Sequence, residues 1–242
     1  MFSSLKDVRL DGGFHIQERK SSLYDSGGSP AEGDGTTTVF YTKYRPIVDD
    51  NGDDVVNTTA VSGVYDVVVY VNGTSVTITS IDAAQGKITL AAAPANGATL
   101  SVSYAWSSID DAMVTLYRRW AYAKIISTIA KVYVMPIDQA STNPDFAGSD
   151  GEAFLHSMEV ELAAGNLLMI TYTEQNDGLH KQGEIKVKAV TKMLDEIRSG
   201  KIQLLDSEYS EFQRLGTLSM GGYPDGTESA AEARKFSVTD RR

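Results

Sequence analysis

Residues 67–106 read VVVYVNGTSVTITSIDAAQGKITLAAAPANGATLSVSYAW, and no other stretch indicates its secondary structure as clearly. β-Branched and aromatic residues fill short runs, which are separated by turn residues at Asn72-Gly73 and Asn96-Gly97. An Asn-Gly pair readily adopts the positive φ angles that a tight hairpin turn needs. Short strands between regularly spaced turns are typical of a small antiparallel β-sandwich or barrel.

The strand pattern continues upstream of this stretch. Residues 36–44 read TTTVFYTKY, and a further Asn-Gly pair follows at Asn51-Gly52. We therefore predict a β domain over residues 36–106. Residues 26–35 are rich in Gly, Ser and Pro and are expected to form an exposed loop before it.

From Ser107 onward the apolar residues recur every three or four positions, which predicts helices. Ser108 is the expected N-cap of the first helix, which should end near Val134 because Pro136 follows. The apolar residues that keep this spacing on the first helix are Ile109, Ala112, Met113, Leu116, Trp120 and Ala123.

Two more helices are predicted over roughly residues 152–174 and 184–199. Gly165 lies in the middle of the former, where Gly costs about 1 kcal/mol relative to Ala, so we expect a kink or a close helix contact there. The expected buried stripes are Phe154, Met158, Leu162, Met169 and Tyr172 on the former helix, and Val187, Val190, Leu194 and Ile197 on the latter.

The order of these segments predicts an α+β chain in which a β domain interrupts a helical domain. Residues 1–35 and 107–206 are expected to form a three-helix domain, residues 36–106 the inserted β domain, and residues 207–242 an extended C-terminal arm. Exposed loops tolerate such insertions best. The arm is polar and Gly-rich, so it is expected to bind a partner rather than build a core.

The composition narrows the class of protein. The chain has 242 residues and a net charge of −10, which argues against binding nucleic acid by neutralising its phosphates. It contains no cysteine, which excludes disulfides, thiolate metal sites and a cysteine nucleophile. The N-terminus lacks a secretory pattern and no stretch is long and apolar enough to span a bilayer, so we expect a cytosolic protein without membrane contact.

No motif of a known catalytic chemistry stands out. The sequence contains no nucleophile elbow, P-loop, dinucleotide fingerprint or HExxH pattern. His156 and Glu159 can share a helix face, but a di-metal helical bundle needs a second such pair, so a solvated polar edge is expected. We therefore predict a non-enzyme with no catalytic residues, no metal and no cofactor.

One acidic stretch resembles the start of a calcium loop. Asp49, Asn51 and Asp53 alternate as in an EF-hand, but Asp54 replaces the glycine of the sixth position and Ala60 stands at the twelfth. Flanking strands are predicted, so an acidic hairpin turn is the expected structure.

Two groups of residues are candidate interaction sites. Basic and aromatic residues on the predicted helices suit a subunit interface, although a solvated face with local ion pairs is the simpler explanation of the charges. Basic and apolar residues near the C-terminus suit an arm that adds a strand to a partner, with a solubilising tail as the alternative. The interface candidates are Arg118, Arg119, Trp120, Lys186, Lys188 and Lys192. The arm candidates are Arg234, Lys235, Phe236, Val238, Arg241 and Arg242.

Short motifs in the helical segments resemble the head-to-tail adaptor (connector, or head-completion) proteins of long-tailed phages. These are FSSLKDVRL at residues 2–10, Ile109 and Ala112 followed by YVMPI at residues 133–137, and a closing helix. The closing helix matches at Leu194, Ile197, Gly200 and Leu204 and departs at Val190, where the family pattern has alanine. The resemblance covers about half of the chain and does not extend to the β domain.

The resemblance implies a structural virion protein of the neck, made in the cytoplasm of a bacterial host. Family members form a ring, usually of twelve copies, beneath the portal protein, and the C-terminal arm grips the portal. DNA passes through the lumen without sequence recognition, for which an acidic wall is suitable. The β domain is then expected to project outward or to contact the next neck or tail protein.

Two other functions fit the same sequence. A phage tail or baseplate protein could bind a host glycan, or another structural protein, through aromatic residues of its β domain, although core packing is the simpler use for them. A hydrolase with paired carboxylates is the third possibility. The aromatic candidates are Tyr41, Tyr44, Tyr65, Tyr70 and Trp106.

Overall fold

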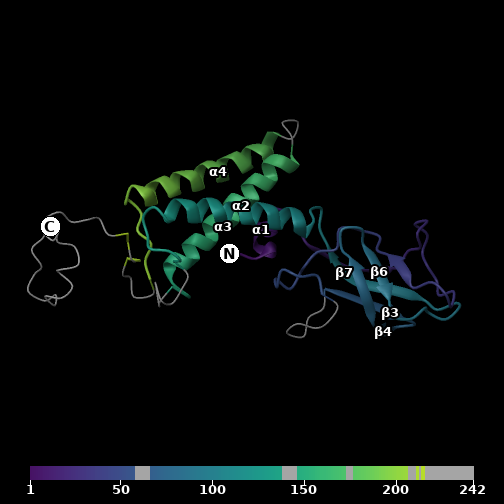
Figure 1. The fold of residues 1–242 in the computed structure, drawn as a ribbon. Coiled ribbons are helices and arrows are strands. Elements are labelled where there is room, and N and C mark those ends of the chain that lie inside the picture. Colours follow the sequence, from purple (N-terminus) through teal and green to yellow (C-terminus); the bar gives the residue numbers. More distant parts are fainter. Residues whose placement is uncertain (58–65, 138–145, 173–176, 207–210, 213, 216–242) are drawn as a thin grey trace, which may run out of the picture.

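Helices and strands occupy opposite ends of the molecule (Figure 1). The computed structural model describes residues 1–57, 66–137, 146–172, 177–206, 211–212 and 214–215. These residues form an α+β fold with one hydrophobic core among the helices and a second among the strands. The predicted fold class is confirmed at this level.

The helical part contains α1 (Leu5–Asp11), α2 (Asp111–Ile129), α3 (Asp150–Thr171) and α4 (Asp177–Arg198). The central helix is α3, which packs against the other three. Its side chains are buried around most of its circumference, so the helical core is built around it. None of the described helices is both long and apolar enough to cross a membrane.

Side-chain caps fix where the helices begin. Ser4 and Asp7 form a reciprocal capping box at α1, and Ser149 caps α3. Asp110, rather than the predicted Ser108, caps α2 by accepting a hydrogen bond from the backbone N of Met113. The predicted end at Val134 is also wrong: α2 ends at Ile129, and the chain then turns to bury Tyr133 in the helical core.

Of the apolar residues that keep helical spacing around α2, only Ile109 is buried. The structure exposes Met113, Leu116 and Trp120 by 41%, 60% and 45%, and Ala112 and Ala123 are exposed as well. Helix α2 has two apolar sides. The side that packs inward includes a charged residue, so a search for apolar spacing does not identify it as the buried side. The buried residues are Val114, Arg118, Ala121, Ile125 and Ile129.

Two glycines, Gly165 and Gly183, allow α3 and α4 to approach closely. A Cβ atom on Gly183 would lie 2.5 Å from the carbonyl oxygen of Gly165, and one on Gly165 would lie 3.0 Å from that of Gly183. The close contact predicted at Gly165 is confirmed. Its partner Gly183 was missed because α4 begins at Asp177, seven residues before the predicted start, in a Gly-containing segment of low helix propensity.

The predicted stripes of α3 and α4 are confirmed in their central residues. Met158, Leu162, Val190, Leu194 and Ile197 are all buried. The remaining members lie partly buried at the edge of the same core: Phe154, Met169, Tyr172 and Val187.

The β part consists of two antiparallel sheets that share one hydrophobic core. One sheet has the order β1-β7-β3-β4 and the other β2-β6-β5. Inward residues alternate along β7 at Leu100, Val102 and Tyr104. The predicted Asn72-Gly73 turn joins β3 to β4, with φ of 48° and 81°. The strands are β1 (Gln17–Ser22), β2 (Val39–Tyr41), β3 (Val67–Val71), β4 (Thr74–Val76), β5 (Ile78–Asp82), β6 (Lys87–Leu90) and β7 (Leu100–Trp106).

Strand β1 corrects the predicted start of the β domain. It pairs with β7 from Gln17 opposite Trp106 to Ser22 opposite Ser101, so the β part begins at residue 17 rather than 36. Its sequence, QERKSS, is almost wholly exposed at the sheet edge, so it lacks the apolar alternation on which the prediction relied. The predicted loop at residues 26–35 therefore lies inside the β part.

The segment after α4 continues to pack on the helices beyond the predicted start of the arm at residue 207. Leu204 and Phe212 are buried in the helical core, and the carbonyl oxygen of Leu205 accepts a hydrogen bond from the backbone N of Gly151 at 2.9 Å. The backbone N of Leu215 donates to the carbonyl oxygen of Val132 at 2.8 Å. The six arm candidates from Arg234 to Arg242 lie outside the described residues.

Candidate functional site

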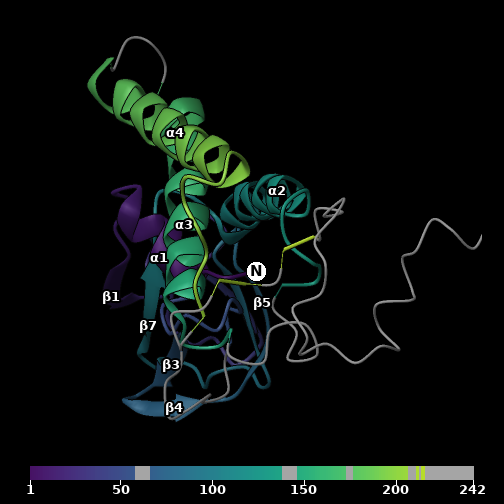
Figure 2. The same cartoon turned by 90° about the vertical axis from the view of Figure 1, so that its left-hand side faces the viewer.

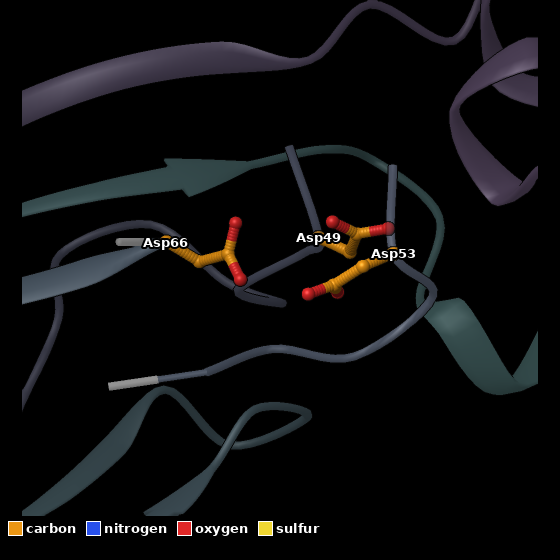
Figure 3. Close-up of side chains that lie close together, drawn as sticks. All are labelled: Asp49, Asp53 and Asp66. Carbon is orange, nitrogen blue, oxygen red and sulfur yellow. The ribbon is translucent and has the colours of Figure 1, made fainter. Parts of the chain in front are cut away.

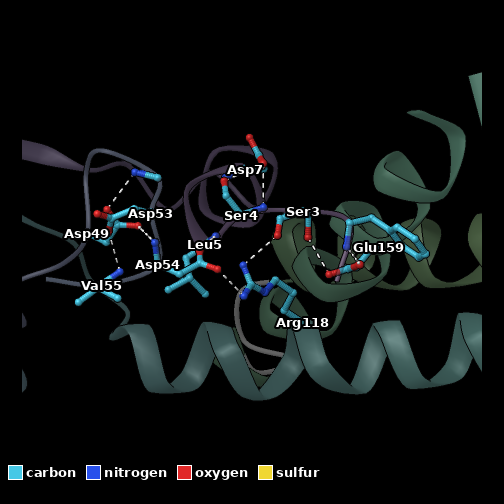
Figure 4. A network of polar contacts seen from close by, with 12 residues as sticks. Ser3, Ser4, Leu5, Asp7, Asp49, Asp53, Asp54, Val55, Arg118 and Glu159 are labelled. Atoms are coloured by element: carbon cyan, nitrogen blue, oxygen red, sulfur yellow. Dashed lines mark hydrogen bonds and ion pairs between the residues drawn. The ribbon is translucent and has the colours of Figure 1, made fainter. Parts of the chain in front are cut away.

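Polar and charged side chains, several of them buried, hold the junction between the helical and β parts; we call them the junction network, and Figure 4 shows its branch around Arg118. The junction network consists of Ser3, Arg9, Asp49, Asp54, Asp111, Arg118 and Glu159. Arg9 of α1 is fully buried, forms an ion pair with Asp111 of α2, and donates to the carbonyl oxygen of Ile109 at 3.2 Å. Asp111 in turn accepts from the backbone N of Asp49, in the loop of the β part, at 3.2 Å.

A second branch of the junction network runs through Arg118. Its Nη2 donates to Asp54 Oδ2 at 2.6 Å and its Nη1 to the carbonyl oxygen of Ser3 at 2.9 Å. Asp54 also accepts from the backbone N of Leu5 at 2.9 Å. Glu159 of α3, fully buried, accepts from Ser3 Oγ at 2.9 Å and from the backbone N of Phe2 at 2.8 Å. The N-terminal segment therefore links three helices to the loop of the β part.

The environment shifts the pKa values of two carboxyl groups of the junction network in opposite directions. Burial alone would raise the pKa of Asp54, but hydrogen bonds from Arg118 and Leu5 outweigh it and hold the pKa below its usual value. Burial raises the pKa of Asp111 despite the adjacent charge of Arg9. Asp54 is therefore the member whose ionised form the fold stabilises.

The lowered pKa of Asp54 predicts how stability depends on pH. Replacing Asp54 with Asn is expected to lower the free energy of unfolding by about 1 kcal/mol at neutral pH, because the carboxyl group is about one-third exposed. A lowered folded pKa contributes stability above the unfolded pKa of about 3.9, and this is lost as pH falls through the folded value. The difference between wild type and variant should therefore shrink below about pH 4 in urea titrations.

The exposed ion pair of Asp195 with Arg198 provides a control for this pH dependence. Asp195→Asn should cost less than about 0.5 kcal/mol at every pH. A difference for Asp54→Asn that stays constant or grows in acid would contradict the assignment.

Three carboxylates gather in the loop that joins the junction network to the sheets (Figure 3). Oxygens of Asp49, Asp53 and Asp66 all lie within 4.8 Å of one another. Asp49 accepts from the backbone N of Gly52 and of Asp54, both at 2.9 Å. The cluster thus orders an acidic turn, but no described strand borders residues 49–54, so the hairpin predicted there is not seen.

The membership of this acidic cluster differs from the sequence pattern. The third member of the cluster is Asp66 and not Asn51. Asp66 is distant in sequence and accepts hydrogen bonds from the backbone N of Asp50 at 3.1 Å and of Asn57 at 2.9 Å. Burial raises the pKa of Asp66 against these hydrogen bonds. Carboxylates are the ligand type that calcium prefers, but the oxygens of Asp49 and Asp66 already hold backbone N–H groups.

Four of the six predicted interface residues have partners within the chain. Arg118, predicted to contact another subunit, is only 4% exposed in this chain and belongs to the junction network. Lys186 binds both carboxylate oxygens of Asp11 at 2.8 Å. Lys188 pairs with Glu184 at 2.9 Å and Lys192 approaches Glu196 at 3.9 Å, which matches the alternative of local ion pairs.

The other two, Arg119 and Trp120, lie together on the exposed side of α2. Arg119 makes no ion pair with another described residue. The ammonium group of Lys124 lies 5.2 Å from the centroid of the Trp120 ring. We refer to Ala112, Met113, Leu116, Arg119, Trp120 and Ala123 as the α2 outer face.

The histidines do not form a catalytic arrangement in the described part of the chain. His156 Nε2 lies 3.2 Å from Asp7 Oδ2, whereas Glu159 points into the junction network, so the two do not act as a pair. His180 lies 3.7 Å from Glu184 in a helical i,i+4 pair, and His15 is exposed.

The aromatic residues of the β part divide into two places. Tyr44 stacks on Trp106 at a centroid distance of 4.8 Å, and both pack on the core of the β part. Tyr41 and Tyr24 line an open hollow of about 420 Å³ together with Asp25 and Arg45. Tyr70 has Lys20 over its ring at 5.1 Å, and Tyr65 lies outside the described residues.

Two of the surfaces that the described residues expose to a partner are the α2 outer face and the tyrosine-lined hollow. The sequence analysis noted Trp120 on the former and Tyr41 on the latter, but it missed Tyr24. Comparison with protein-family models, with curated proteins and with solved structures finds no match to this chain.

Proposed function

We propose that this chain is a structural, non-catalytic virion protein, a head-to-tail adaptor that forms a ring between the portal and the tail neck of a tailed phage. The junction network carries the proposal. An adaptor has to hold two attachment surfaces at a constant separation, and the Arg118–Asp54 ion pair together with the hydrogen bond from Asp49 to Asp111 joins the two parts and restricts hinge motion. These contacts join the helical and β ends of the molecule, which lie apart in Figure 1.

Charge and the sequence resemblance give further support. A net charge of −10 suits a lumen through which DNA passes without adhering, because the wall repels phosphates. In this proposal the helical part makes the ring and binds the portal together with the arm, and the β part contacts the neck or tail. The protein is made in the cytoplasm of the bacterial host and ends in the virion neck.

The test is assembly with purified portal rings of the phage whose particles contain this chain. We expect the full chain to add one ring per portal in mass measurements, with an open channel in electron micrographs. A chain ending at residue 233 lacks the predicted arm contacts and should lose portal binding by at least about tenfold while its melting temperature stays the same. A full chain that does not bind the portal ring would contradict the proposal.

The hollow beside Tyr41 supports a second candidate function, a tail or baseplate protein that binds a host glycan. Its tyrosine rings, carboxylate and guanidinium group are the side-chain types that bind sugars by stacking and hydrogen bonding. Purified bacterial surface polysaccharide should then bind the wild type, lose affinity for Tyr41→Ala and keep it for Tyr70→Ala. Absence of binding to any such polysaccharide leaves the adaptor as the better assignment.

A further inference from the structure

The α2 outer face is apolar although it lies opposite the buried side of the same helix. Leu116 and Trp120 are 60% and 45% exposed, and Met113 lies beside them. A helix that is apolar on both sides is normally buried on both sides. Contiguous exposed apolar side chains of this kind mark a contact surface.

A surface of complementary character lies between α1 and α3. Asp7, Leu10 and Asp11 of α1 and Val160 and Glu161 of α3 line an open hollow of about 340 Å³. Leu10 is 55% exposed at its rim, so the hollow combines apolar surface with carboxylates. We call it the α1–α3 hollow.

The two surfaces carry complementary charges. Arg119 and Lys124 flank the apolar residues of the α2 outer face. The α1–α3 hollow carries three carboxylates, of which Asp11 is paired with Lys186 and Asp7 lies 3.2 Å from His156, which also lines the hollow. Arg119 and Glu161 make no ion pair with another described residue. Their juxtaposition across an interface would supply each with a partner.

The two surfaces lie on opposite sides of the molecule. Figure 2 shows α1 to one side of α3 and α2 to the other. One copy can therefore offer its α2 outer face to one neighbour and its α1–α3 hollow to another. Such a heterologous contact propagates, and it closes into a ring when the rotation between copies allows it.

We infer that the α2 outer face of one copy docks in the α1–α3 hollow of a second copy of this chain. Trp120 and Leu116 contact Leu10 and Val160, and Arg119 pairs with Glu161. The inference rests on the proposed function only in that both require self-assembly. Beyond the proposed function, the inference specifies which two surfaces of the chain contact each other.

Charge reversal tests the contact with two variants of the full chain. Arg119→Glu and Glu161→Arg should each weaken self-association at least about tenfold in sedimentation velocity, because each places like charges together. Mixing the two variants should restore association, since every contact between unlike copies then joins opposite charges. Lys201→Glu is the control: it changes the charge equally, at an exposed site after α4, and should associate as wild type does.

An apolar pair of variants tests the same contact. Trp120→Ala should weaken association at least about tenfold, whereas Ile185→Ala, which truncates a 66% exposed side chain on α4, should not. Unchanged melting temperatures show that the variants are folded. Wild type that remains monomeric up to about 1 mM overturns the inference.

The remaining outcomes separate this inference from the adaptor function. If Glu161→Arg associates normally while Arg119→Glu does not, the α2 outer face binds elsewhere and the inference is wrong, although ring formation can still be correct. If the mixture restores assembly but the assembly does not bind the portal, the contact is correct and the adaptor function is wrong.

Discussion

Replacing Arg9 with alanine is expected to lower the free energy of unfolding by about 3 kcal/mol and the melting temperature by about 6–12 °C. Arg9 is completely buried and pairs with Asp111, which remains 22% exposed. Removing the guanidinium group leaves a cavity and an unpaired, largely desolvated carboxylate. Urea and thermal unfolding measure the loss.

Two variants identify the cause of that loss. Lys6 forms an exposed ion pair with Asp50 at 3.4 Å, so Lys6→Ala should cost less than about 1 kcal/mol. Arg9→Met should cost less than Arg9→Ala, because it fills the space and removes Nε and Nη1, which have no hydrogen-bond partner among the described residues. Equal losses for Lys6→Ala and Arg9→Ala would show that the junction network does not stabilise the fold.

Replacing Gly183 with valine is expected to cost about 3 kcal/mol, which exceeds any gain in helix propensity. A Cβ atom there would lie 2.5 Å from the Gly165 carbonyl oxygen and 3.0 Å from Leu168 Cβ. The nearest atom belongs to backbone, so α4 has to move away from α3, and the core between them loses contacts. Thermal unfolding followed by circular dichroism measures the effect.

Gly178 is the matched control for this substitution. It lies in the first turn of the same helix, and a Cβ atom there would meet nothing within 4 Å. Gly178→Val should therefore change the free energy of unfolding by less than about 0.5 kcal/mol. If both variants unfold alike, the close approach of α3 and α4 does not set the stability.

The sequence predicts best what depends on local backbone and apolar spacing. The Asn72-Gly73 turn was found because tight turns need residues that tolerate positive φ. The alternation of Leu100, Val102 and Tyr104 on β7, and the buried stripe of α4, were found because those elements each bury one side. In these cases short-range pattern and long-range packing agree.

The features that the sequence did not predict share a different cause. Strand β1 is exposed and polar, so only its pairing with β7 makes it a strand. On α2 the packing selects the side with Arg118, because Asp54 and Ser3 from distant segments compensate its charge. Asp66 joins Asp49 and Asp53 only through the fold. These partners are distant in sequence, so the residue spacing within one segment does not predict them.

The same hidden strand has a consequence for how the chain can change. Because β1 and β7 are neighbours, the β part leaves and rejoins the helices at adjacent points, with Gln17 opposite Trp106. The β part therefore stands where a single loop could connect the helices. A different inserted domain can take its place without repacking α1 to α4. The exchange carries one condition. A graft has to bring a carboxylate to the position of Asp54, since Arg118 otherwise retains only the Ser3 carbonyl.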